Sequence, residues 1–184
     1  MKMNQKRTLA LLLFTALTFT QCKDAGENVE PDDENELITT ITLKFAEKGT
    51  TTVNTFSYKD TDGDGGNAPV QFDTILLKPN TAYTLTVEMK DESKTPAEDV
   101  TEEIQEKAEE HLLIYTPAPA TLLTYTYGDK DANNFNIGLK GEALTGAAGT
   151  GKLKVQLRHQ PGTKNGSAVP GSDDVNLDFT LTVK

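Results

Sequence analysis

The chain of 184 residues contains one cysteine, two histidines and no tryptophan. A single cysteine excludes an internal disulfide. No G-x-S-x-G motif surrounds a serine, so the nucleophile arrangement of many hydrolases is missing. Basic residues are also scarce, because 18 Lys and Arg stand against 28 Asp and Glu, and a net charge of −10 has the wrong sign for binding nucleic-acid phosphates. We therefore expect neither an enzyme nor a nucleic-acid-binding protein.

The N-terminal hydrophobic run is short. Residues 9–19 are apolar over about half the length that spans a bilayer, and they follow a basic segment, which is typical of a secretion signal. Residues 17–22 (LTFTQC) resemble a bacterial lipobox, in which the cysteine is acylated, although Gln21 replaces the usual small residue. We expect residues 1–21 to be a lipoprotein signal peptide and Cys22 to carry the lipid that anchors the protein to a membrane. An ordinary signal followed by an unpaired thiol is the alternative.

Residues 22–36 contain almost nothing that could be buried and are strongly acidic. Such a composition predicts a disordered tether between the lipid and the folded domain. Acidic residues soon after the cysteine resemble the export signal of Bacteroidetes-type lipoproteins. We therefore expect the protein at the outer membrane, exposed on the cell surface.

Alternation of apolar and polar residues dominates residues 37–184. A period of two predicts half-buried strands, and Gly, Asn, Pro and Asp clusters separate the candidates. This pattern predicts a single mainly β domain, an antiparallel immunoglobulin-like sandwich of eight or nine strands. The expected strands lie at residues 37–45, 53–58, 72–77, 83–89, 112–115, 123–127, 135–139, 153–159 and 175–183.

One segment has a helical period instead. Thr95 and Glu98 have the spacing of a capping box with Pro96 at the first helical position, and apolar residues then recur every four positions. We expect a short crossover helix over residues 96–110. Its outer face is acidic, which suits either plain solvation or docking of a basic partner.

The most specific motif is a calcium-type loop. Asp60, Asp62 and Asp64 alternate before Gly65, as in the D-x-D-x-D-G start of an EF-hand loop. Gln71 stands where an EF-hand has its bidentate Glu, and Asp73 is a possible substitute. The alternative is an acidic hairpin turn without an ion.

A weaker copy of this loop follows later. Asp129, Asp131 and Asn133 repeat the alternation, and Glu142 has the same offset from Asp129 as Asp73 has from Asp60. We expect calcium here as a second, weaker possibility.

The two histidines are candidate ligands for zinc or copper. His111 follows the expected helix, where a histidine can simply cap the C-terminus. His159 continues the inward register of a strand. Should the two histidines converge with Glu109 or Glu110, a zinc or copper site becomes possible. The alternative for His159 is a hydrogen-bonded histidine at the rim of the sheet.

Seven segments carry a family resemblance: the lipobox and residues 36–40, 62–66, 95–104, 110–111, 145–151 and 157–159. Together they resemble one family of small Bacteroidetes-type lipoproteins, commonly labelled "type 1 periplasmic binding fold superfamily protein". That label implies a doubly wound α/β fold, but a parallel sheet needs helices between its strands and this chain offers one. We therefore keep the antiparallel expectation. The resemblance also implies that the strand ending at His159 runs beside the one beginning at His111.

The resemblance implies a cell-envelope lipoprotein that works beside an outer-membrane transporter. We expect a non-catalytic binding or accessory module that captures a metal or small ligand. A calcium-stabilised structural or adhesive surface domain is the alternative.

Overall fold

A computed structural model describes residues 36–62 and 66–184. The signal peptide, Cys22, the tether up to residue 35 and Asp64 lie outside these residues. Within them, no helix is long and apolar enough to cross a membrane.

The described chain is mainly β. One α-helix, α1 (Val100–Glu106), and one turn of 3₁₀-helix, η1 (Ala120–Leu122), interrupt eleven strands. The strands are β1 (Thr40–Glu47), β2 (Val53–Lys59), β3 (Gln71–Phe72), β4 (Ile75–Leu77), β5 (Ala82–Asp91), β6 (Glu98–Asp99), β7 (His111–Ala118), β8 (Leu123–Tyr127), β9 (Lys140–Thr145), β10 (Gly149–His159) and β11 (Ser172–Val183).

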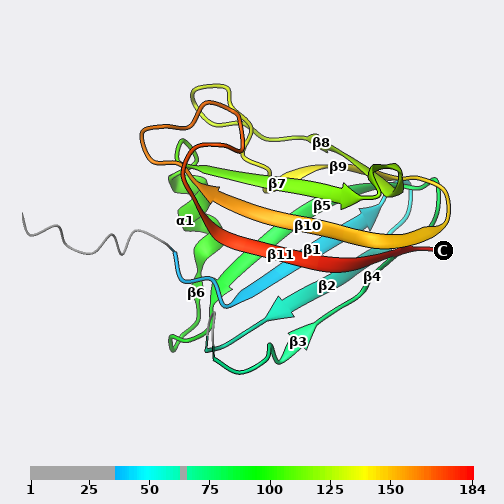
Figure 1. Cartoon of the computed structure of the whole chain (residues 1–184), viewed down its shortest axis with the longest axis horizontal. Coiled ribbons are helices and arrows are strands. Elements are labelled where there is room, and N and C mark those ends of the chain that lie inside the picture. Colours follow the sequence, from blue (N-terminus) through cyan, green and yellow to red (C-terminus); the bar gives the residue numbers. More distant parts are fainter. Residues whose placement is uncertain (1–35, 63–65) are drawn as a thin grey trace, which may run out of the picture. The chain divides into compact units, whose positions relative to one another are not determined.

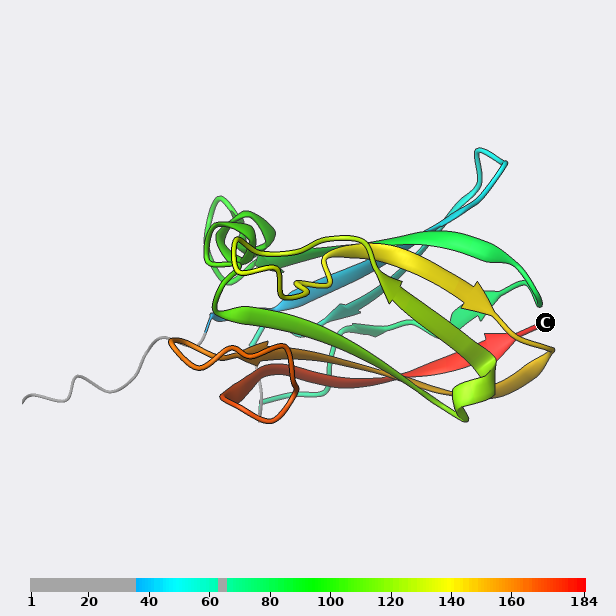
Figure 2. The same ribbon diagram turned by 90° about the horizontal axis from the view of Figure 1, so that it is seen from above.

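The strands form two sheets (Figures 1 and 2). The larger has the order β3-β2-β1-β5-β9-β8, with β6 also paired to β5, and the smaller has the order β4-β11-β10-β7. All pairs are antiparallel except β4 with β11, which are parallel. The expectation of antiparallel sheets in a mainly β chain is thus confirmed, with this one exception.

Apolar side chains from both sheets pack into one hydrophobic cluster. Phe45 and Tyr83 of the larger sheet meet edge to face with ring centroids 6.0 Å apart, and both are fully buried. Phe179 is the equivalent anchor of the smaller sheet. Because side chains alternate across a strand, each sheet turns one apolar face inward and the two faces bury each other.

Two strand predictions were wrong in detail. Residues 135–139 do not form a strand. The neighbour of β5 is β9, which the sequence pattern did not predict because a glycine and a threonine weaken its alternation of polar and apolar residues. The segment 72–77 is two strands: β3 pairs with β2 in the larger sheet, whereas β4 pairs with β11 in the smaller one. The chain therefore crosses between the sheets at residues 73–74.

The helix is shorter than predicted. Its N-cap is Asp99, whose side chain accepts a hydrogen bond from the Thr101 amide, and not Thr95. β6 pairs with the end of β5, so the backbone stays extended up to the cap. The chain has left the helix by Lys107, before the predicted end at residue 110.

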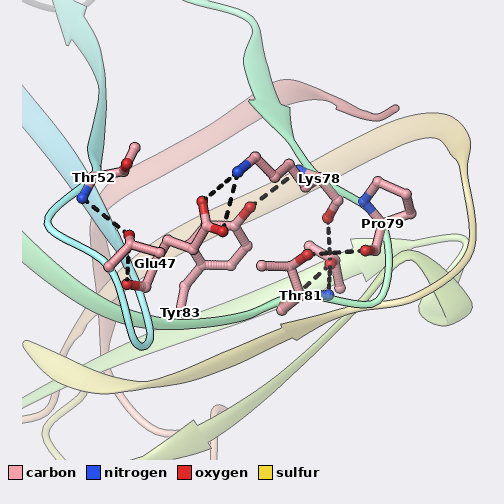
Figure 3. A network of polar contacts seen from close by, with 8 residues as sticks. Glu47, Thr52, Lys78, Pro79, Thr81 and Tyr83 are labelled. Carbon is pink, nitrogen blue, oxygen red and sulfur yellow. Dashed lines mark hydrogen bonds and ion pairs between the residues drawn. The ribbon is translucent and has the colours of Figure 1, made fainter.

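A polar network ties the β4–β5 connection to β1 (Figure 3). The Lys78 ammonium lies 2.8 Å from a carboxylate oxygen of Glu47, and the Lys78 amide donates to the Tyr83 hydroxyl at 3.0 Å. The Thr81 hydroxyl donates to the Pro79 carbonyl at 2.9 Å. These bonds hold the connection that carries the chain from the smaller sheet to the larger one.

Gly171, just before β11, provides a test of close packing. Its φ is +79°, and a Cβ placed there would lie 1.7 Å from the His159 carbonyl oxygen. Gly162 also has positive φ, +63°, but its Cβ would meet nothing within 4 Å. Gly162→Ala should lower the free energy of unfolding by about 1–2 kcal/mol through its backbone conformation alone.

Gly171→Ala should lower the free energy of unfolding by ~1–3 kcal/mol more than Gly162→Ala does, because the β10 backbone must also move. Urea unfolding of the two variants measures the difference. Equal losses of stability in the two variants would show that the end of β10 can move aside without an energetic cost.

Candidate functional site

A bulge at the start of β11 creates the candidate site. The register pairs Leu157 with Val175 and Arg158 with Asp173, so Asp174 is an extra residue without a partner on β10. A bulge re-aims the side chains beside it. Asp173 reaches Arg158, with 2.5 Å between guanidinium and carboxylate, while the Asp174 side chain is turned inward and is fully buried.

The same strand ends bring the two histidines together, as predicted. His159 of β10 pairs with His111 of β7, and their rings stack with centroids 4.9 Å apart and planes 9° from parallel. His159 Nε2 lies 3.8 Å from a Glu110 carboxylate oxygen, whereas His111 Nε2 lies 3.7 Å from Asp174 Oδ2. Each imidazole thus faces a different carboxylate.

Burial keeps His111 neutral. Removal from solvent lowers the pKa of His111 to about 4, although the hydrogen bond from its Nδ1 to the Lys107 carbonyl, at 3.1 Å, works in the opposite direction. A carbonyl only accepts, so Nδ1 carries the proton and Nε2 is bare. The atom of His111 that faces Asp174 therefore cannot neutralise it.

Asp174 is a carboxyl group without a donor. Both of its oxygens are buried and have no hydrogen-bond partner, and His111 Nε2 has none either. Burial raises the pKa of Asp174 to about 6, against the favourable charge interaction with His159. At neutral pH the protein therefore holds a buried, unpaired negative charge, which is costly.

Asp174 lines a pocket of about 220 Å³, which we call the acidic pocket. Its walls come from the residues before β1, the end of β2 and the start of β11. They include no basic side chain: the lining residues are Glu36, Leu37, Ile38, Ile41, Tyr58, Asp60, Asp173, Asp174, Val175, Asn176 and Leu177.

Two of the four carboxylates in the acidic pocket are paired. Asp173 binds Arg158, and Glu36 lies 3.0 Å from the Lys107 ammonium. Asp60 is only half satisfied: Oδ2 accepts a hydrogen bond from the Tyr58 hydroxyl at 3.1 Å, but Oδ1 is buried without a partner. Asp60 and Asp174 thus carry the uncompensated charge.

In the described part of the chain, no three His, Cys, Asp or Glu side chains are grouped so that they could hold a metal ion. An imidazole lone pair lies in the plane of its ring, so the stacked rings of His111 and His159 do not aim at a common point. Zinc or copper at these histidines stays a prediction that would need one ring to turn.

The first calcium-type loop is described only in part. Asp62 accepts hydrogen bonds from the Asn67 amide and side chain, and these bonds lower its pKa. Asp73 accepts from the Ser57 amide at 2.8 Å. Asp60 points to the acidic pocket. Calcium at this loop stays a prediction.

The second loop is held by its own hydrogen bonds. The two oxygens of Asp129 accept from the backbone amides of Gly138 and Lys140. Asp131 pairs with the buried Lys164 ammonium at 2.8 Å, and Glu142 pairs with Lys48. Asn133 is exposed. An ion here would have to compete with these bonds, and calcium at this loop also stays a prediction.

The sequence did not identify Asp174 or the acidic pocket. A signal was present, because two consecutive aspartates precede the strand expected at residues 175–183, and an extrapolated period of two would bury Asp173. Only the register of β11 against β10 shows that the bulge buries Asp174 in its place.

Comparison with known protein families, curated proteins and solved structures gives no match for this chain. A function must therefore be argued from the site itself.

Asp174→Asn should stabilise the protein at high pH. The folded pKa of about 6 lies above the ordinary value of 3.8, so the ionised group lowers the free energy of unfolding above pH 6, and this penalty disappears as the pH falls towards 4. The variant should gain roughly 1–3 kcal/mol at pH 8 and little at pH 4. Urea unfolding at both pH values measures this.

Asp173→Asn is the matched control. Burial raises the pKa of Asp173, but the hydrogen bond and charge of Arg158 lower it by more. This variant should therefore lose stability at pH 8. Similar losses in both variants would show that Asp174 has a compensating partner.

Proposed function

We propose that this chain is a lipid-anchored cell-envelope protein whose folded domain is a non-catalytic binding module, with the acidic pocket as its ligand site. The observation that carries the proposal is Asp174, a buried carboxylate with both oxygens unpartnered on the wall of a pocket. Buried polar groups in native proteins are nearly always hydrogen-bonded. An exception that lines a pocket is explained by a ligand that supplies the missing donors.

The resemblance to outer-membrane lipoproteins supports the same proposal. A module held at the cell surface by Cys22 could capture a metal ion or small ligand and pass it to an outer-membrane transporter. We also propose that the domain is an immunoglobulin-like variant. The two face-to-face sheets support this, while the parallel pair β4–β11 departs from a purely antiparallel arrangement.

A calcium-stabilised structural or adhesive domain is the second candidate. Asp60 and Asp62 stand at the start of the loop whose sequence favours calcium. In that case calcium would act through the loop and would not need Asp174.

The lipid anchor is tested at its acceptor. Cys22→Ser removes the thiol that would be acylated, so the variant should lose labelling by a fatty-acid analogue and leave the membrane fraction. Cys22→Ala should behave identically. Membrane fractionation that is unchanged in both variants would contradict lipid anchoring.

The ligand site is tested by ligand charge. Melting temperatures of the full mature chain in detergent are measured with small cations (calcium, zinc, copper and alkylammonium), with carboxylate anions and with neutral sugars. A ligand that binds the folded state at a hundred times its Kd stabilises it by about 2.7 kcal/mol. We expect at least one cation to stabilise the wild type, and neither anions nor sugars to do so.

The variant Asp174→Asn removes the unpartnered carboxylate but leaves Asp60 of the calcium-type loop in place, and it should lose this response. A response to calcium alone that survives in this variant would favour the structural domain. The absence of any response to the cations would contradict a cation-binding pocket.

A further inference from the structure

The acidic pocket lacks hydrogen-bond donors. Its unpartnered atoms, Asp60 Oδ1 and both oxygens of Asp174, are acceptors; Asp60 is 5% exposed and the side chain of Asp174 is fully buried. The polar groups beside them are the Tyr58 hydroxyl, which already donates to Asp60, and the Asn176 amide, which donates to Asp173. The missing partner must therefore bring donors and positive charge.

The remaining walls are apolar. Leu37, Ile38, Ile41, Val175 and Leu177 line the acidic pocket together with the carboxylates. Its volume of about 220 Å³ would hold roughly seven water molecules at ~30 Å³ each. A ligand of several carbon and nitrogen atoms fits this space and can cover the apolar walls, which a bare ion cannot do.

A metal ion fits this site less well. Calcium requires six to eight oxygen ligands and zinc requires four ligands, and both need them converged on one point. No three acidic, histidine or cysteine side chains of the described chain are grouped in that way. An ammonium group needs less convergence, because each of its three N–H bonds can reach a different acceptor.

We propose that the acidic pocket binds a small aliphatic amine, with a primary ammonium group at one or both ends of a short apolar chain. The carboxylate oxygens are closed off in the free protein, so the ammonium reaches them when the two side chains turn towards the pocket. Asp174 is then the main acceptor of the ammonium, Asp60 Oδ1 accepts a second N–H, and the apolar walls enclose the carbon chain. This inference rests on the proposed function, and it names the chemical class of the ligand.

The experiment is calorimetry on the full mature chain in detergent, with 1,4-diaminobutane and butylammonium as probes. Butan-1-ol is the matched neutral probe, and calcium and zinc chlorides are the metal probes. We expect the amines to bind and butan-1-ol not to bind. Asp174→Asn should weaken amine binding at least tenfold, or about 1.4 kcal/mol.

Asp178→Asn is the matched control. Asp178 lies on the same strand, is exposed and pairs with Lys152 and Lys154, so this variant changes the net charge equally without touching the acidic pocket. It should change amine affinity less than twofold. Equal loss of amine affinity in the two variants would mean that the amine is attracted only by the net negative charge of the protein. That result would overturn the inference.

A second variant tests the site independently of Asp174. Leu37 is half exposed and lines the acidic pocket, so Leu37→Lys would bring a tethered ammonium to its mouth and should weaken binding of the free amine. Leu144→Lys, an equally exposed position on β9 outside the pocket lining, should not. Equal effects of the two lysines would contradict the assigned site.

The remaining outcomes separate the inference from the proposed function. Metal binding that depends on Asp174, without amine binding, would overturn the amine and leave the binding function in place. Absence of binding by both amines and metals would overturn both.

Discussion

The two-residue period of side chains along a strand is the constraint on which the rest of the structure depends. Each sheet is stable only because its inward face buries apolar residues against the other sheet, so a shift of one residue would expose the whole set. β10 keeps this period to its end at His159. Its neighbour β11 interrupts the period once, at the bulge, and this single extra residue moves Asp173 to the outside and Asp174 to the inside.

The consequences of the bulge extend to the helix and to the chain before β1. His111 donates to the C-cap carbonyl of α1 and so turns its bare nitrogen towards Asp174, while Lys107, the C-cap residue, pairs with Glu36 at the pocket wall. The C-cap residue of α1 thus fixes the tautomer of His111 and compensates the charge of Glu36 in the acidic pocket. Asp174 is left without a hydrogen-bond donor from His111, because the nitrogen of His111 that faces its carboxylate carries no proton.

Strand positions and the class of fold could be predicted because long alternating runs encode them directly. The nearness of His111 and His159 was expected from the family resemblance, and the antiparallel pairing of β10 with β7 accounts for it. The helix boundaries could not be predicted, because the pairing of β6 with β5 overrides a good capping sequence. Asp174 could not either, because a bulge depends on the register between two strands, which the side-chain period of one strand does not contain. Thus sequence patterns locate strands, whereas the site depends on a departure from the pattern.

The charge of the whole chain and the charge of the acidic pocket act differently on a cation. A net charge of −10 attracts any cation, but salt screens such attraction beyond about 10 Å at 0.1 M, and it does not distinguish one cation from another. The carboxylate of Asp174 is buried, so its interaction is screened much less. Selectivity can arise only there, where unpaired acceptors lie beside apolar walls. A cation that also carries an apolar chain satisfies both surfaces, whereas a hydrated ion satisfies one and leaves the other exposed.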